Sequence, residues 1–265
     1  MSVKFDHLVH FTNQPELVKE SFKELGFQAI TGGKHPNWGT YNALCYFEGL
    51  RYLEWIGFSD MKVAKLSDNI LIQQVLEDSQ VDEGFSQVAF RTNDIVGLAD
   101  RLKKQGLDVV GPVPGSRKKE DGSVLNWSML FINEEQPLGL RAPFFIQWGK
   151  NDEAREIEMK ELFTHSEQTS TISYVGYVVH DIEKAIEKYS SILGIPSDST
   201  NKYEDEFGEY KEFHMTGFTI RFYQPTTSEL IALLNNKGER PFLSGISSVS
   251  KEKTVLMAGG YYRLE

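Results

Sequence analysis

The sequence lacks several features that would direct its interpretation elsewhere. It has a single cysteine, Cys45, among 265 residues, which excludes a disulfide framework within the chain. It has no apolar run long enough to span a bilayer, and no basic segment leading into an apolar one at its start. These absences predict a cytoplasmic protein.

Acidic residues outnumber basic ones. The sequence also lacks the common motifs of nucleotide binding. The net charge is −10, and such an average repels polyanions, so we expect neither nucleic acid nor an anionic membrane as a partner. The glycine-rich stretch Gly32–Thr40 lacks the Lys-Ser/Thr ending of a P-loop and does not follow the Rossmann pattern. A hydrophobic fraction of 40% still provides for a sizeable core.

One segment of the sequence is repeated in similar form. FDHLVHFTN (Phe5–Asn13) and FSQVAFRTN (Phe85–Asn93) share Phe, Thr and Asn at matching places, while His7 in the first becomes Gln87 in the second. Hydrophobic periodicity and turn residues predict a strand, a helix and three strands after each start. The expected strands are 5–11, 27–30, 42–47 and 52–58 in the first copy and 85–92, 107–113, 124–132 and 144–148 in the second.

A third, blurred copy follows a charged stretch, Asn151–Gln168. Strands are expected at 173–179, 212–216 and 219–223, with a helix capped by Asp181 and ended by Gly194. The tail predicts a helix near 228–236 and a strand near 254–257, and residues 68–79 predict a connector helix between the first two copies. We therefore expect an α+β protein with paired βαβββ modules in residues 1–150, and a linker plus a degenerate third module in residues 151–265.

Two such modules side by side form a half-barrel with a shared cavity, and at this point the sequence resembles a known group. The pair resembles the vicinal-oxygen-chelate superfamily, which includes glyoxalase I, extradiol dioxygenases and bleomycin-resistance proteins. More narrowly, it is similar to the glyoxalase-like domain family. That similarity is carried by GGKHPNWGTYNAL (Gly32–Leu44) and YLEW (Tyr52–Trp55), and by Arg117, Asp121-Gly122 and Trp127. The resemblance covers about Ser2–Trp148.

The resemblance implies a metal site where the first and last strands of the two modules converge. Aligning YLEW with FIQW implies the four ligands His7, Glu54, Gln87 and Gln147. Such a site would take one divalent ion, Zn²⁺, Fe²⁺, Mn²⁺ or Ni²⁺. Because a Gln carbonyl is a neutral and weaker donor, one carboxylate would carry the whole countercharge. The alternative is a site with no cofactor, in which His7 and Glu54 hydrogen-bond each other or a ligand.

Other residues are candidates for ligand contact. His35, in a Gly- and Pro-rich loop, is either a general acid or base or a loop-ordering side chain. Arg117 either grips a carboxylate in bidentate fashion or is a solvated loop charge. We expect Asn42 and Asn126, placed at equivalent positions of their modules, to read polar groups of the ligand, and Trp38 is a candidate substrate contact.

The third copy has no metal pair, because Tyr174 aligns with Gln87 and Arg221 lies near the Gln147 position. An odd number of units leaves one concave face unpaired, which the tail or a second subunit of a homodimer would cover.

Three functions remain open. The first is a metal-dependent lyase, isomerase or dioxygenase acting on a small oxygen-rich molecule, with Glu54 or His35 moving the proton and Arg117 holding a carboxylate. The second is a metal-free protein that binds or sequesters a drug-like ligand without turnover. The third is an interaction module whose site is vestigial.

Overall fold

The computed structural model of the chain describes residues 3–118, 122–134, 138–163, 170–196, 201–247 and 252–265. Parts of the charged stretch 151–168 and of the polar loop 117–122, with Asp121, lie outside the described residues. Elements of the first two units and the segment after them are β1 (Val3–Phe11), α1 (Pro15–Glu24), β2 (Ala29–His35), β3 (Thr40–Phe47), β4 (Arg51–Phe58), α2 (Met61–Lys65), α3 (Ile70–Ser79), β5 (Gly84–Thr92), α4 (Ile95–Lys104), β6 (Val109–Lys118), β7 (Val124–Ile132), β8 (Phe144–Trp148), α5 (Asp152–Met159) and a 3-10 turn, Lys160–Phe163. The remaining elements are β9 (Thr171–Val178), α6 (Ile182–Leu193), β10 (Tyr203–Asp205), β11 (Gly208–Met215), β12 (Phe218–Pro225), α7 (Ser228–Lys237), β13 (Arg240–Ser247), β14 (Lys253–Met257) and β15 (Gly260–Leu264).

The helix following the first strand of each unit begins and ends for local reasons. Pro15 occupies the first turn of α1, where its missing N–H costs nothing. The side chains of Asp94 and Asp181 accept hydrogen bonds from Gly97 N and Lys184 N, as capping residues do. Gly194 ends α6 in the left-handed region, with φ +68°.

The first two units form one eight-stranded sheet in the order β2-β3-β4-β1-β5-β8-β7-β6. The first strands β1 and β5 meet antiparallel at its centre, with Leu8 opposite Val88. The register slips once at Asp6 and once at Ser86, so each strand carries a β-bulge at the same place of its repeat. The tandem βαβββ half-barrel predicted from the repeat is confirmed.

The second sheet has seven strands, in the order β10-β11-β12-β9-β13-β15-β14. β9 and β13 pair antiparallel at its centre, as β1 and β5 do. The tail therefore supplies three strands, where the sequence predicted one, and they form a shortened fourth unit. The chain's own tail, rather than a second subunit, completes this sheet.

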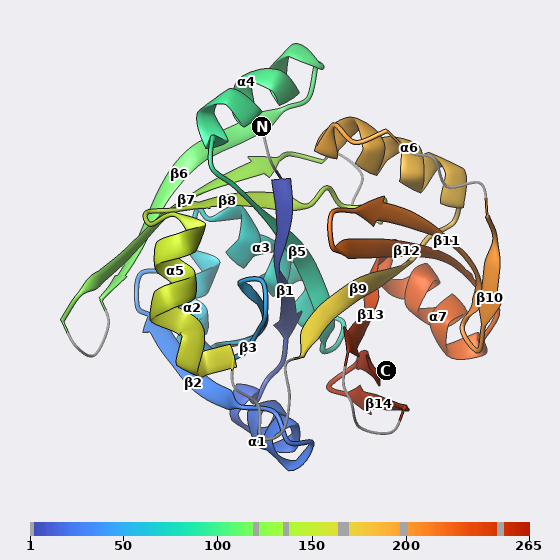
Figure 1. Cartoon of the computed structure of the whole chain (residues 1–265), viewed down its shortest axis with the longest axis horizontal. Helices are drawn as coiled ribbons and strands as arrows, with labels where there is room; N and C mark the ends of the chain where they lie inside the picture. Colours follow the sequence, from blue (N-terminus) through green and yellow to red (C-terminus); the bar gives the residue numbers. More distant parts are fainter. Residues whose placement is uncertain (1–2, 119–121, 135–137, 164–169, 197–200, 248–251) are drawn as a thin grey trace.

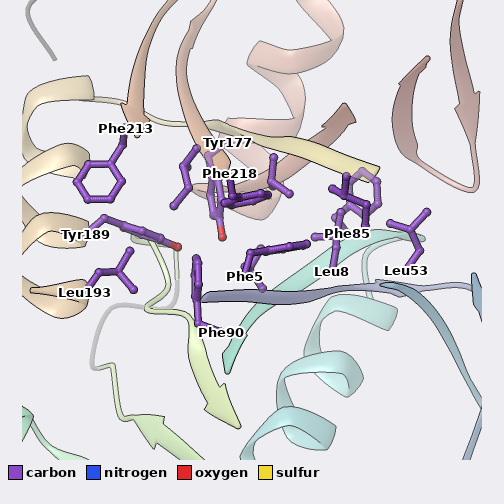
Figure 2. Close-up of a cluster of buried hydrophobic side chains, with 14 of the residues drawn as sticks. Phe5, Leu8, Leu53, Phe85, Phe90, Tyr177, Tyr189, Leu193, Phe213 and Phe218 are labelled. Atoms are coloured by element: carbon purple, nitrogen blue, oxygen red, sulfur yellow. The ribbon is translucent and has the colours of Figure 1, made fainter. Parts of the chain in front are cut away.

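The outer faces of the two sheets pack against each other. Their central strands lie beside one another in the middle of the molecule (Figure 1). Figure 2 shows Phe5 and Leu8 of β1 facing Tyr177 and Phe218 of the second sheet within one apolar cluster. The rings of Phe5 and Phe218 stack with centroids 4.1 Å apart. Because this core is shared, burial of apolar surface holds the two halves together.

Each concave face is covered by the helix that precedes its second central strand. α3 buries Leu71, Ile72, Val75 and Leu76 in the first half-barrel, and α7 buries Leu230 and Leu234 in the second. The connector helix expected at 68–79 is thus present as α3, and it fills part of the predicted cavity. Across the described residues, no helix is long and apolar enough to cross a membrane.

Candidate functional site

A cavity of about 80 Å³ remains in the first half-barrel beside α3. Its walls combine aliphatic side chains with aromatic ones, and the aromatic residues come from both modules: Trp38, Tyr46, Tyr52, Trp127, Phe144 and Trp148. Its polar residues include His7, His35, Asn42, Glu54 and Arg117. Drug-sized ligands occupy about 300–1,000 Å³, so this cavity admits a much smaller molecule or one end of a longer one.

His7 is held by its neighbour in the sequence. Its Nδ1 lies 2.8 Å from Asp6 Oδ1, and its ring stacks on Tyr52 with centroids 4.3 Å apart. In a regular strand, adjacent side chains point to opposite faces. The bulge at Asp6 breaks that alternation, and the two side chains meet.

Asp6 is fully buried and surrounded by donors and positive charge. Its Oδ2 accepts a hydrogen bond from Trp148 Nε1 at 3.1 Å, and Arg155 and Arg91 lie within 3.8 Å of it. Burial alone raises the pKa of this carboxyl, but the His7 hydrogen bond and the two guanidinium charges outweigh it and lower the pKa. Asp6 is therefore a carboxylate at neutral pH.

Glu54 shares the polar end of the cavity with His7. Glu54 Oε2 is 3.6 Å from His7 Nε2, and Oε1 accepts a 2.6 Å hydrogen bond from Asn42 Nδ2. Asn42 Oδ1 in turn accepts from Gly33 N at 2.8 Å, which fixes the orientation of its amide. The carboxylate is therefore oriented by the backbone of β2, acting through Asn42.

Arg117 reaches the cavity from the opposite edge of the sheet. It lies on β6, yet a Cβ placed on Gly33 of β2 would come within 2.7 Å of Arg117 Nη1. Arg117 is half-buried and has no ion-pair partner in the described part of the chain. The two edge strands thus converge at the mouth, and the Arg117 guanidinium stands between them.

His35 and Trp38 lie at the same mouth. His35 Nδ1 is 3.1 Å from Thr40 Oγ1, and its ring lies 5.6 Å from that of Trp38. Burial lowers the pKa of His35; Glu54 raises it and Arg117 lowers it further. His35 is accordingly neutral at neutral pH, and both side chains line the cavity as expected from the sequence.

The structure does not bring the two glutamines to the cavity. Gln87 Nε2 donates to Gln74 Oε1 and Ala142 O, so its side chain is occupied by α3 and the segment before β8. Gln147 Oε1 accepts from Ile95 N at the start of α4, and it lines a groove on the outside of the sheet. In the second module, α3 therefore covers the position that corresponds to His7.

The alignment that paired Glu54 with Gln147 was wrong by three residues. Glu54 pairs with Val9, and Val9 corresponds to Ala89 in the second unit, which pairs with Phe144. Phe144 is therefore the structural counterpart of Glu54. An odd shift along a strand moves every side chain to the other face, which is why Gln147 points away.

Asn126 is likewise not the counterpart of Asn42. Asn42 pairs with Ile56 and Met129 with Ile146, so Met129 holds the equivalent position. Leu125, Trp127 and Met129 line the cavity, whereas Asn126 lies between them on the exposed face.

The remaining donor set does not fit a divalent metal. Of the four implied ligands, only His7 and Glu54 converge, and Phe144 stands where a third would be. No group of three His, Cys, Asp or Glu side chains suitable for a metal occurs among the described residues. Structural and catalytic sites of these ions use three or four protein ligands.

Asp6 is the site residue that the sequence analysis missed. FDHLVH reads as a regular strand, in which Asp6 would face away from His7. An acidic residue buried in an otherwise apolar central strand was the available signal, because such a charge is retained only when paired. Tyr52 and Phe144, which hold the His7 ring, gave no such signal.

The paired βαβββ modules and the cavity between them define a member of the vicinal-oxygen-chelate superfamily. Within it, the chain belongs to the glyoxalase-like domain family, whose profile matches residues 5–196. That range extends beyond Trp148 through α6. No curated protein matches the chain.

Solved structures share the fold. A hypothetical protein from Staphylococcus aureus aligns with a TM-score of 0.80 at 21% identity, over 100% of this chain and 99% of its own. A mutant of 4-hydroxymandelate synthase from Streptomyces coelicolor aligns at 0.58 and 12% identity, over 93% of this chain and 71% of its own. At these identities the likeness concerns architecture alone.

Proposed function

We propose that this protein binds a small oxygen-rich carboxylate in the first half-barrel without a metal. The observation that carries this proposal is Arg117, a half-buried guanidinium at the cavity mouth without an ion-pair partner in the described chain. A guanidinium matches a carboxylate in bidentate geometry. Arg117 is also the one Lys or Arg among the residues lining the cavity.

The size and lining of the cavity narrow the ligand. About 80 Å³ suits an acid of about three or four carbons, and a drug-sized natural product could place only one end there. The aromatic walls suit a flat carbon skeleton. His7, His35 and Glu54 would face its other oxygens, and Glu54 and His35 stay candidates for proton transfer.

Metal-assisted lyase or dioxygenase chemistry is not part of this proposal, because the donor set offers two ligands where such ions need more. Elemental analysis of untagged protein, purified without chelator, tests this directly. We expect less than stoichiometric transition metal, and equal ligand affinity before and after dialysis against EDTA. A stoichiometric metal that is lost in His7→Ala would overturn the metal-free proposal.

Calorimetric titration with pyruvate and with its uncharged analogue acetone tests the carboxylate. Arg117→Ala should weaken pyruvate binding about 10- to 100-fold, the range for loss of a charged hydrogen bond. The matched control is Lys34→Ala, which removes one positive charge from an exposed neighbour of Gly33 outside the cavity. Equal losses in the two variants, or acetone binding as well as pyruvate, would count against the role of Arg117.

A further inference from the structure

The hydrogen bond between Asp6 and His7 determines which tautomer the neutral imidazole adopts. A carboxylate only accepts, so His7 Nδ1 carries the hydrogen and donates it to Asp6 Oδ1. In the neutral ring the other nitrogen, Nε2, then has a free lone pair. Nε2 has no hydrogen-bond partner among the described residues and lies at the cavity, 3.6 Å from Glu54 Oε2. A lone pair aimed at a bound molecule is what a general base requires.

The side chain of Asp6 does not line the cavity. It is 0% exposed and absent from the cavity lining, and its second oxygen is occupied by Trp148 Nε1. Arg155, from α5 outside the paired modules, is stacked on Trp148 with its guanidinium carbon 4.4 Å from the ring centroid. These contacts hold Asp6 in place while its other oxygen orients His7.

We propose that His7, positioned by Asp6, is the general base of a metal-free tautomerase that acts on a small 2-oxo acid. This inference rests on the proposed binding of a small carboxylate. His7 Nε2 takes a proton from the carbon beside the carbonyl. The C–H bond breaks, its electron pair forms a C=C bond, and the carbonyl becomes an enolate oxygen. Return of the proton from Nε2 to the enolate oxygen gives the enol and completes the tautomerisation, whereas return to carbon regenerates the oxo acid; no oxidant, reductant or co-reactant is consumed.

The surrounding charges favour this step. After proton transfer, the imidazolium lies between the carboxylates of Asp6 and Glu54, which stabilise it. Arg117 holds the carboxylate of the oxo acid. Asn42 is engaged with Glu54 and Gly33, so it keeps the Glu54 carboxylate oriented rather than contacting the enolate.

An Asp–His pair also supports histidines that bind metals, where the carboxylate orients the ring. The two roles differ in their need for a metal. A base positioned by Asp6 works in protein treated with EDTA, whereas a metal-bound His7 has no lone pair to offer. The experiment therefore uses protein treated with EDTA throughout.

The probe is pyruvate in D₂O, observed by proton NMR. Binding is measured first by saturation transfer, and then the rate at which the methyl hydrogens exchange for deuterium is compared with a protein-free sample. We expect wild-type protein to bind pyruvate and to accelerate exchange. Binding without accelerated exchange would overturn the tautomerase while leaving the binding function intact. No binding would overturn the binding function and the tautomerase with it.

Variants separate the base from its positioning residue. His7→Gln should abolish the acceleration. Asp6→Asn should lower the exchange rate at saturating pyruvate about 10²- to 10⁴-fold, the typical contribution of acid–base catalysis, while pyruvate affinity changes less than threefold. If Asp6 only supports the fold, Asp6→Asn should lower the pyruvate affinity and the exchange rate together. That result would contradict the role of Asp6 in positioning His7. If Asp6→Asn does not fold, His7→Gln decides the question alone.

The matched control is Ser86→Ala. Ser86 sits at the second bulge, hydrogen-bonds Asp78 and is not among the residues that line the cavity. Its removal should cost stability and leave the exchange rate at saturation within about twofold of the wild type. A loss equal to that of Asp6→Asn would show that disturbing either bulge disturbs the site, and would overturn the specific role of Asp6.

Discussion

The two half-barrels share one architecture and have opposite interiors. Where the first carries His7 and Glu54, the second carries Tyr174 and Arg221 at the same register positions. Arg221 lies 3.6 Å from the centroid of the Tyr174 ring and pairs with Glu212 at 2.9 Å. Phe207, between β10 and β11, inserts into the second interior.

The comparison shows how a binding site survives in a duplicated fold. In the first interior, polar groups are paired on one side and open on the other, as with His7 Nε2 and Arg117. In the second, the arginines are paired: Arg263, at the position of Phe144, bonds Asp205 and Glu206. A filled, fully paired interior stabilises the fold, whereas an open one costs stability and permits binding.

Emptying the second interior should have the largest effect. Phe207→Ala removes a ring that packs against Phe242 and Tyr261 at centroid distances of 5.2 and 4.9 Å. We expect the free energy of unfolding to fall by about 3–5 kcal/mol, as for other buried Phe to Ala changes. Urea titration followed by far-UV circular dichroism measures this. A loss below about 1 kcal/mol would show that the second interior is not well packed.

The core shared by the two halves should respond to acid. His10 of β1 hydrogen-bonds Tyr262 and Ala258 O of the tail, and burial lowers its pKa to about 4. The unfolded chain binds this proton at higher pH than the folded one, so its contribution is complete above about pH 6.5 and falls as pH drops towards 4.

We expect a loss of about 3 kcal/mol across that window. Other groups also titrate there, so the measurement is the difference in pH slope between the wild type and His10→Gln. Identical slopes in the two proteins would contradict the assignment to His10.

Equivalent positions in the two interiors should tolerate substitution differently. Arg221→Met removes the ion pair with Glu212 and the contact with Tyr174, which should cost about 2–3 kcal/mol. Glu54→Gln, at the matching position, should change stability by less than about 1 kcal/mol, because it also relieves the repulsion between Glu54 and Asp6 across His7. Parallel urea titrations compare the two. Equal losses of unfolding free energy in the two variants would contradict the distinction between a binding interior and a packed one.

The smallest effect on the fold is expected at the mouth. Gly33→Ala places a Cβ 2.7 Å from Arg117 Nη1, the mobile end of a flexible side chain. The side chain can move aside, so the free energy of unfolding should change by less than about 1 kcal/mol. Pyruvate affinity, measured by calorimetry, should nevertheless fall towards that of Arg117→Ala. Unchanged affinity would mean that Arg117 need not occupy this place.

The repeat made most of the fold predictable, because FDHLVHFTN and FSQVAFRTN are each the first strand of a complete βαβββ unit. Leu8 and Val88, at matching places of the two stretches, pair at the centre of the sheet. The fourth unit was missed because it lacks a helix after its first strand, and Arg240–Ser247 contains a proline. Of its three strands the sequence predicted only β14; β13 joins the sheet by pairing with β9, and β15 by pairing with β13.

His7 and Glu54 lie at the cavity as the resemblance implied, but Gln87, on the equally recognisable first strand of the second copy, is taken up by α3. The prediction failed for Gln147 and Asn126, whose alignment rested on a Trp match and on loops of unequal length. Hydrogen-bond register, which sequence similarity does not report, decides which face these residues occupy. Asp6 was missed because a bulge overrides strict alternation without changing the composition of the strand.

Bulges recur at matching places of the central strands of both sheets, and those at Asp6 and Ser86 have different partners. At the first, Asp6 hydrogen-bonds His7, which lines the cavity. At the second, Ser86 donates a hydrogen bond to Asp78 of α3, which also forms ion pairs with Arg141 and with Arg240 of β13. These interactions connect β5, α3 and the distant β13. The same backbone irregularity thus has two consequences: at Asp6 it orients a side chain of the cavity, and at Ser86 it fastens distant parts of the chain together.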